Sequence, residues 1–489
     1  MFAELKRLLR HVSVYGLSNI VSRMLSFLLL PFHTNLLQST ADYGIAVLLF
    51  ASLGFANVLY AYGIDSAFLR FYLMQEKGFT KKNTFSTTYL SMVLTSVLFS
   101  SIIFLFPEFF AELCLVGAEH AGLIRWCSGI LLFDTLVILP FLVLRAEERS
   151  TLFMVLKLIN VSVTLGMNIL FLVYLKEGLV GIFKANFIGS GITLIMMIPL
   201  IYRKFSFDFS NKVYAGLMKF GLPYIFTGLS VMIMDMIDRY LIKNILGESA
   251  AGIYGAGYKL SMAMVLMVTA FRFAWHPFFL SISEKGDAKV IYAKVLTYFV
   301  LIAGWIYLGI CFFVKDVVSL GTGTWHFIPE DYWSGLPIVP VVMASYILYG
   351  IYVNFVVGIY IKKKSKYLPF ITGISAATNI ILNYYLIPVY GMMGAAYATV
   401  FSYGLMAVLL LIVTRRFYPV NYEYLRILHI VFVIAILFYT WTFIPGKFSI
   451  LTEFGLLLLY PVLLFLTGFF NKQERDRFRN ILNSYILKN

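Results

Sequence analysis

Charged residues are scarce in this 489-residue chain. Only 13% of the residues are Asp, Glu, Lys or Arg, and 61% are hydrophobic, whereas soluble domains carry about 25% charged residues. This composition excludes a cytosolic enzyme, a nucleic-acid-binding domain and a disordered chain. Cysteine is also rare. The chain has three cysteines, and they form neither a metal-ligand spacing nor an even disulfide set. We therefore expect no metal, no cofactor and no nucleic-acid partner.

The apolar residues form fourteen runs that are long enough to cross a bilayer, which takes about 20 residues per helix. They lack the apolar–polar alternation of a membrane β-barrel. The basic start of the chain is followed by no small-residue cleavage site, so we expect the first run to be retained as a helix. The pattern predicts an all-α integral membrane protein with fourteen transmembrane helices. The predicted spans are 13–36, 44–66, 85–106, 121–143, 152–175, 179–201, 217–241, 252–275, 293–314, 336–360, 368–387, 392–414, 427–445 and 449–469.

Lys and Arg residues are about four times as numerous in the segments on one side of the membrane as in those on the other. Cytoplasmic segments are the ones enriched in Lys and Arg, so we expect the N-terminus to be cytoplasmic. An even number of spans then places the C-terminus in the cytoplasm as well. The longest segment on the other side, 315–335, is too short to fold as a catalytic domain. The sequence contains no HExxH, GxSxG or nucleotide-binding loop. These observations predict that the protein is not an enzyme and that ATP is not its direct energy source.

An internal repeat links the first two spans with the seventh and eighth. In both pairs an apolar helix and a short Ser-Ala-containing turn precede a Tyr-Gly step, which is Tyr43-Gly44 in one and Tyr254-Gly255 in the other. Both pairs cross the membrane in the same direction, as in transporters that consist of two parallel halves. We predict a six-helix N-lobe over 1–212, a six-helix C-lobe over 213–418, and two extra helices with a cytoplasmic tail over 419–489. A central cavity would lie between the lobes.

Basic side chains within the spans are the first candidates for a substrate site, because ionisable groups inside a membrane are costly and functional by default. Arg23 and Lys259 are the deepest. Arg70 and Arg272 lie near the cytoplasmic ends of their spans, where each side chain would alternatively extend to the membrane surface. Arg239 follows Asp238, so an interfacial ion pair is the alternative to ligand contact.

Acidic and amide side chains form a second group. Asp235 and Asp238 share a helix face, and together with Asp65 they are candidates for binding a coupling ion; the alternative is that they neutralise Lys259 or Arg239. Asp134, in the middle of the fourth span, is interpreted as a helix-packing or hinge residue, with a functional role as the alternative. The intramembrane asparagines are expected to bond between helices; they are Asn160, Asn168, Asn379 and Asn383.

Three stretches of the chain resemble the polysaccharide flippases, a branch of the multidrug/oligosaccharidyl-lipid/polysaccharide exporter superfamily. They are YGLSNIVSRMLSFLLLPFHTNLL from Tyr15, DRYLIKNILGESAAGIYGAGYKLS from Asp238 and NIILNYYLIPVYGMMGAAYATVFSYG from Asn379. The resemblance implies a V-shaped transporter with two lobes that works by alternating access. It would move undecaprenyl-pyrophosphate-linked oligosaccharide from the inner to the outer leaflet of the bacterial plasma membrane, for a surface polysaccharide such as O-antigen.

The same resemblance implies a cationic central cavity. This maps onto Arg23 and Lys259, and further onto Arg70, Arg239 and Arg272. A relative, the lipid II flippase, has arginines in its first two helices, which Arg23 and Arg70 match. The implied partners are a polyprenyl-pyrophosphate oligosaccharide, membrane lipids, H⁺ or Na⁺ as the coupling ion, and the polymerase and glycosyltransferases of the pathway.

Two other functions are alternatives for a membrane-embedded chain. A cation-coupled multidrug antiporter of the same superfamily would depend on Asp235 or Asp238 and not on Arg23. A membrane glycosyltransferase or polymerase would need catalytic carboxylates on a sizeable loop, and no such loop exists. The basic character of the deep charges favours the flippase.

Overall fold

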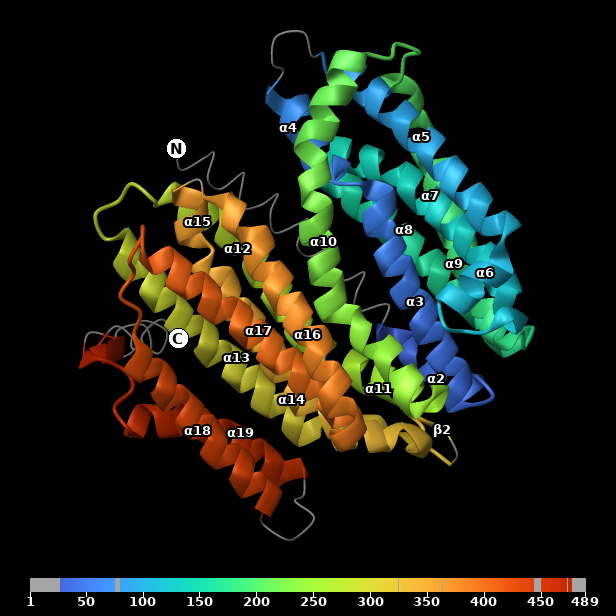
Figure 1. Ribbon diagram of the computed structural model, residues 1–489. Coiled ribbons are helices and arrows are strands. Elements are labelled where there is room, and N and C mark those ends of the chain that lie inside the picture. The colour runs from blue at the N-terminus through green and yellow to red at the C-terminus, as the bar shows by residue number, and fades with distance from the viewer. Residues whose placement is uncertain are drawn as a thin grey trace, which may run out of the picture.

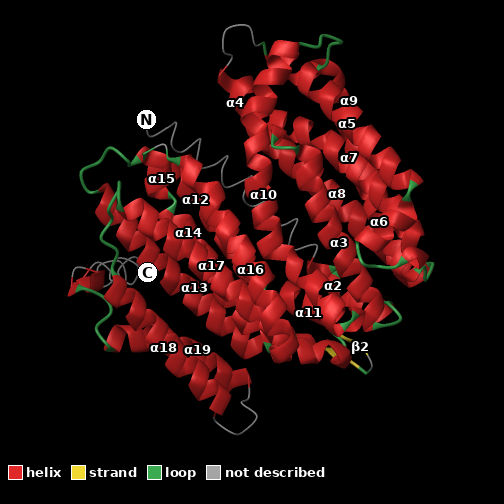
Figure 2. Cartoon of the chain, viewed as in Figure 1, coloured by secondary structure: helices red, strands yellow, loops and turns green. Residues whose placement is uncertain are grey.

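The computed structural model describes residues 27–74, 80–323, 325–362, 364–443, 450–472 and 474–476. Helices make up nearly all of this part of the chain, with one short pair of strands at one end (Figure 2). The first-half elements are α2 (Leu30–Leu36), α3 (Thr40–Ala61), α4 (Ile64–Met74), α5 (Lys81–Leu105), α6 (Pro107–Leu113), η1 (Ala118–His120), α7 (Ala121–Ala146), α8 (Ser150–Ile169), η2 (Leu170–Tyr174) and α9 (Gly178–Lys204).

The second half begins with the longest helix. Its elements are α10 (Asn211–Leu246), α11 (Glu248–Leu260), α12 (Met262–Ser281), α13 (Ala288–Ser319), β1 (Gly321–Thr322), β2 (Trp325–His326), η3 (Glu330–Gly335), α14 (Ile338–Phe355), α15 (Val357–Ile361), η4 (Ser365–Tyr367), α16 (Leu368–Tyr390), α17 (Met392–Arg415), α18 (Tyr424–Phe443) and α19 (Ile450–Leu466). The strands pair antiparallel, with Gly321 opposite His326.

Twelve of the described helices are long and apolar enough to cross a membrane, and α19 is a shorter apolar helix. Large apolar side chains on their outer faces are exposed, such as Leu94 at 68% on α5 and Leu425 at 84% on α18. Such surfaces suit lipid and not water, so the prediction of an all-α, multi-pass membrane protein is confirmed. The first predicted span, 13–36, lies largely outside the described residues, and the full count of fourteen stays a prediction.

Several predicted spans are divided into shorter helices, and two of these breaks affect how the helices are arranged. The second span bends where Tyr62 and Gly63 adopt positive φ angles of 31° and 73°, which ends α3 before α4 begins. The eighth, 252–275, is two helices, α11 and α12, that meet at Ser261. Neither break contains a proline or a polar loop that divides the apolar run, so the hydropathy pattern did not reveal them. The second break lies two residues after Lys259, and it places that side chain at the end of a helix.

The helices gather into two groups (Figure 1). We call α3–α9 the N-terminal bundle and α12–α17 the C-terminal bundle; α10 and α11 run between them, and α18 and α19 lie outside, with both packed against α13. Helix α10 packs against α3 and α4 on one side and against α16 on the other. The predicted domain boundaries at 212 and 418 stay predictions.

The backbones of the two halves come close together where α3 crosses α11. A Cβ atom on Gly44 would lie 2.0 Å from the carbonyl oxygen of Glu248, and one on Gly252 would lie 2.1 Å from that of Thr40. The hydroxyls of Thr40 and Ser249 are 2.7 Å apart across the same crossing. Only glycine permits backbones to approach this closely. Gly44 and Gly252 therefore determine how close the two halves lie at the α3–α11 crossing.

Candidate functional site: a polar cavity between the bundles

A cavity of about 320 Å³ lies between the two bundles, next to the α3–α11 crossing. It combines charged, aromatic and small side chains from both halves of the chain, so its shape depends on how the bundles are arranged. Its lining residues are Leu29, His33, Tyr43, Val47, Phe50, Ala51, Thr164, Asn186, Asp235, Met236, Arg239, Gly255, Tyr258, Lys259, Met262, Val265 and Tyr346.

Lys259 is the cation in this lining that has no anionic partner among the described residues. It is half-buried near the end of α11, and its Nζ lies 5.5 Å from the centre of the Tyr43 ring. No described carboxylate comes within 4 Å of it. An ammonium held inside a membrane by an aromatic face alone keeps its hydrogen-bond donors available for an anionic ligand.

Arg239 also lines the cavity, but its charge is compensated. Its Nη1 lies 2.9 Å from Oδ1 of Asp238, a carboxylate that is only 1% exposed and that also accepts a hydrogen bond of 2.5 Å from the Tyr254 hydroxyl. The guanidinium stacks over the Tyr258 ring at 4.3 Å. The ion pair that was the alternative to ligand contact is therefore present, although Arg239 still faces the cavity.

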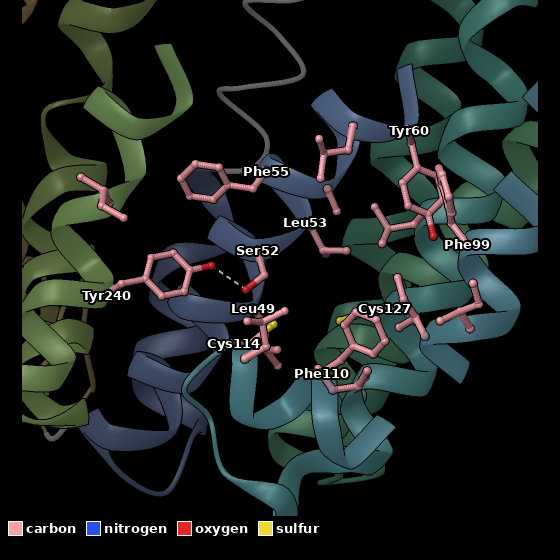
Figure 3. Close-up of a pocket in the computed structure, with 18 of the residues that line it drawn as sticks. Leu49, Ser52, Leu53, Phe55, Tyr60, Phe99, Phe110, Cys114, Cys127 and Tyr240 are labelled. Atoms are coloured by element: carbon pink, nitrogen blue, oxygen red, sulfur yellow. Dashed lines mark hydrogen bonds between the residues drawn. The ribbon is translucent and has the colours of Figure 1, made fainter. Parts of the chain in front are cut away.

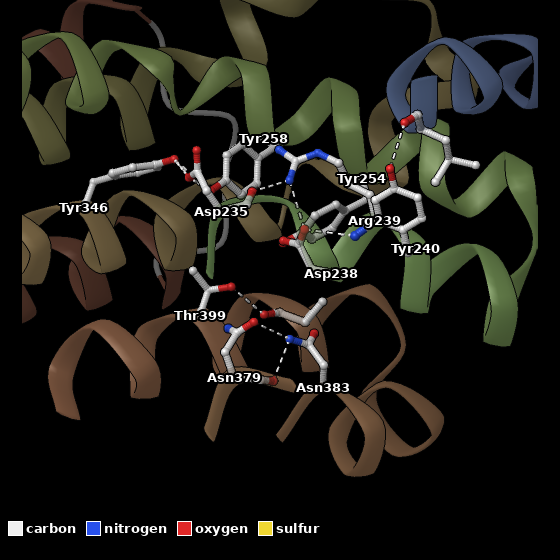
Figure 4. A network of polar contacts seen from close by, with 12 residues as sticks. Asp235, Asp238, Arg239, Tyr240, Tyr254, Tyr258, Tyr346, Asn379, Asn383 and Thr399 are labelled. Carbon is white, nitrogen blue, oxygen red and sulfur yellow. Dashed lines mark hydrogen bonds and ion pairs between the residues drawn. The ribbon is translucent and has the colours of Figure 1, made fainter. Parts of the chain in front are cut away.

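Asp235 is held by two tyrosines (Figure 4). The hydroxyls of Tyr258 and Tyr346 both donate to its Oδ1, at 3.0 and 2.6 Å, and lie 2.7 Å from each other. Asp235 lines the cavity, whereas Asp238 is not among the lining residues. The two carboxylates thus have different surroundings, and Asp235 is the one that a ligand or ion in the cavity would meet.

The remaining predicted site residues lie elsewhere. Arg70 is on α4, with its guanidinium 4.7 Å from the centre of the Phe220 ring, and it does not line this cavity. Arg272 donates to the Tyr349 hydroxyl at 2.9 Å and lines a separate cavity between α10 and the C-terminal bundle. Arg23 lies outside the described residues, and so does the side chain of Asp65.

Several lining residues were not predicted from the sequence. His33 is buried and lies 3.0 Å, through Nε2, from Oδ1 of Asn168, which joins α2 to α8. Tyr258 precedes Lys259 directly, so its place beside the charges had a local signal. Tyr346 had none, because it comes from α14 and the chain contains 33 tyrosines.

A second cavity, of about 740 Å³, has a different character (Figure 3). Its lining comes from α3, α5, α6, α7 and α10 and is almost entirely apolar. The Ser52 and Tyr240 hydroxyls, 2.6 Å apart, satisfy each other within it. Helices α3 and α10 therefore form a wall with charged residues on one side and a surface suited to hydrocarbon on the other.

Comparison with known proteins gives a family and a fold. The profile of the family described as "Polysaccharide biosynthesis protein" matches residues 8–283. The chain is similar in structure to the lipid II flippase MurJ in an inward closed conformation, with a TM-score of 0.75, 16% identity, and coverage of 93% of this chain and 98% of that one. It is also similar to an inward-facing multidrug resistance MATE family transporter of the MOP superfamily, with a TM-score of 0.65, 14% identity, and coverage of 83% and 97%. No curated protein sequence matches it.

Proposed function

Because the chain belongs to the polysaccharide biosynthesis protein family, a family of MOP-superfamily transporters and not of enzymes, we propose that it flips a polyprenyl-pyrophosphate-linked oligosaccharide across the membrane. The proposed cargo is an undecaprenyl-pyrophosphate glycan that is destined for a surface polysaccharide such as O-antigen. The proposed direction is from the cytoplasmic to the outer leaflet of the bacterial plasma membrane, with both termini in the cytoplasm.

The observation that carries this proposal is Lys259, an ammonium without a carboxylate partner among the described residues, beside Arg239 in a cavity between the bundles. Pyrophosphate is the group in the cargo that such donors recognise, Arg through its planar fork and Lys as a point charge. Arg23 would add a further cation.

The energetics explain why such a cavity is needed. Each sugar hydroxyl left unpaired in hydrocarbon costs about 2–7 kcal/mol, so an oligosaccharide does not cross a bilayer unaided. A polar cavity removes most of this cost while the polyprenyl tail stays in the lipid. Outward movement of an anion also gains about 2.3 kcal/mol per charge for each 100 mV of inside-negative potential.

Alternating access would use the α3–α11 crossing as the gate on the outer side. The glycine-to-glycine contact and the Thr40–Ser249 hydrogen bond close this end. Separation of the two helices would open the cavity there. We further propose that H⁺ or Na⁺ bound at Asp235, with Asp238 or Asp65 as the other candidate carboxylates, couples this movement to an ion gradient.

The test is neutralisation of Lys259. We expect Lys259→Gln to abolish flipping of an undecaprenyl-pyrophosphate oligosaccharide in proteoliposomes and to abolish surface polysaccharide in cells, while Lys259→Arg retains part of both. The matched control is Lys289→Gln, since Lys289 also lies over a tyrosine ring, that of Tyr418 at 5.0 Å, but does not line the cavity. Normal export by Lys259→Gln would overturn the cavity assignment.

The second candidate function is cation-coupled drug export, which is favoured by one observation: Asp235 is in the cavity lining. It predicts drug efflux that is lost in Asp235→Asn and unaffected in Lys259→Gln. A flippase, in contrast, should lose transport in Lys259→Gln. The same two variants therefore distinguish a flippase from a drug exporter.

A further inference from the structure

A third cavity, of about 580 Å³, lies inside the N-terminal bundle. Its polar lining comes from α3, α7, α8 and α9 and includes a carboxylate, an ammonium, a guanidinium, amides and hydroxyls. One of its walls, the Phe273 ring, is contributed by α12 of the C-terminal half. The lining residues are Asn57, Ala61, Asp134, Val137, Ile138, Phe141, Leu142, Arg145, Phe153, Lys157, Asn160, Thr164, Asn186, Ser190, Thr193 and Phe273.

Some of these polar groups serve helix packing. Asn160 donates to the carbonyl oxygen of Gly189 at 3.1 Å and to the Thr193 hydroxyl at 2.8 Å, which ties α8 to α9. The Ser190 hydroxyl donates to Oδ1 of Asp134 at 2.6 Å, which ties α9 to α7. The packing role predicted for Asp134 therefore accounts for one of its two carboxylate oxygens.

Lys157 has no such role. Its Nζ lies 4.4 Å from the centre of the Phe141 ring, and it makes no hydrogen bond or ion pair with any described residue. Covering the ring does not require an ammonium, because a methionine would do the same; the charge of Lys157 acts on Asp134, with which it interacts electrostatically. Lys157 and the second carboxylate oxygen of Asp134 thus supply a donor and an acceptor to the cavity, and the exposed Arg145 adds a further positive charge to the lining.

This cavity adjoins the one between the bundles, because Thr164 of α8 and Asn186 of α9 line both. A ligand whose charged group is held at Lys259 would extend past these two residues to reach Lys157. The volume lies within the roughly 300–1,000 Å³ of pockets that hold small molecules.

We propose that this cavity binds the sugar residues next to the pyrophosphate, so that the head group is shared between two subsites. A sugar offers hydroxyls that both donate and accept, and apolar ring faces; Asp134, Lys157 and the amides match the former, and Phe141, Phe153 and Phe273 match the latter. The Asp134 carboxylate in the lining repels a phosphate, whereas it accepts hydrogen bonds from sugar hydroxyls. This inference rests on the proposed function.

The experiment compares two probes on the purified full-length protein in nanodiscs. One probe is undecaprenyl pyrophosphate and the other is undecaprenyl-pyrophosphate-linked N-acetylglucosamine. We expect the wild type to bind the sugar-bearing probe more tightly. Asp134→Asn and Lys157→Met should each weaken that probe about tenfold and leave the bare probe unchanged, whereas Lys259→Gln should weaken both. Phe273→Leu, from the other half of the chain, replaces either variant if one fails to assemble.

The outcomes separate the two proposals. Equal affinity of the wild type for both probes would overturn the sugar subsite, and so would Asp134 and Lys157 variants that weaken both probes alike or neither. A wild type that binds neither probe would overturn the proposed function itself, and the subsite with it.

Discussion

Adding one methyl group at Gly252 should open the contact between the two halves of the protein. In Gly252→Ala the new Cβ would lie 2.1 Å from the Thr40 carbonyl oxygen and 2.8 Å from the Gly44 nitrogen. An ordinary contact begins at 3.4 Å, so α3 and α11 must separate by about 1.3 Å. Neither neighbour can turn aside, because both atoms belong to the backbone.

The magnitude follows from the cost of overpacking, which is about 1–3 kcal/mol. If that cost falls only on the state in which the crossing is closed, the ratio of closed to open molecules drops by roughly 5- to 150-fold. The matched control is Gly373→Ala on α16, where an added Cβ meets nothing within 4 Å. That variant should leave the ratio unchanged.

Disulfide formation between Thr40→Cys and Ser249→Cys reports the closed state, because the two native hydroxyls are 2.7 Å apart. The pair would be placed in a background without the native cysteines, Cys114, Cys127 and Cys311. We expect fast crosslinking that blocks transport until the bond is reduced, and slower crosslinking when Gly252→Ala is added. Crosslinking at the parental rate would refute the assignment of this crossing as a gate.

Two further predictions concern carboxylates. Glu147 lies at the end of α7 and accepts hydrogen bonds from Lys204 and Tyr72, which lower its pKa even though burial opposes this. The ionised Glu147 therefore stabilises the fold above the ordinary glutamate pKa of 4.5, and this stabilisation is lost as the pH falls below that value. Glu147→Gln should lower the free energy of unfolding at neutral pH by about 1–3 kcal/mol. In melting curves the variant should lose less stability than the wild type as the pH is lowered. The same loss of stability with falling pH in both proteins would contradict this. Asp235→Asn should bind undecaprenyl pyrophosphate severalfold more tightly than the wild type in nanodiscs, because it removes a negative charge from the lining that contains Lys259; unchanged or weaker binding would count against a shared site.

Hydropathy predicted most of the helices because each must satisfy its own backbone in lipid and show an apolar surface there. It was least accurate at helix ends. Helix α10 runs from Asn211 to Leu246, beyond the predicted 217–241, because a helix continues past the apolar region with polar residues such as Lys212 and Lys243. The break after Lys259 has no signal in hydropathy either.

The candidate site was predictable only in part. Intramembrane charge pointed to Lys259, Arg239 and Asp235, and the structure places all three in one lining. The partners that distinguish them come from distant helices: Tyr346 on α14 holds Asp235, and Tyr43 on α3 faces Lys259. Tyr43 belongs to the repeated Tyr-Gly step, but that pattern does not place it beside Lys259, and a chain with 33 tyrosines offers no pattern that singles out Tyr346.

The charges of the described residues constrain how substrate and ion would act together. Lys259 and Arg239 are matched in number by Asp235 and Asp238, so a surplus of positive charge depends on Arg23 or on neutralisation of a carboxylate. Asp238 is already paired, and Asp235 is the one that faces the cavity. A proton or cation at Asp235 would therefore strengthen the attraction of the cavity for a pyrophosphate, and the pyrophosphate would strengthen the binding of the cation by the same factor. In such a cavity the ion and the anionic cargo assist each other's binding, so an inward ion gradient would drive export only if the ion leaves Asp235 before the cargo moves outward. A cationic drug and the ion, in contrast, would compete for the same carboxylate.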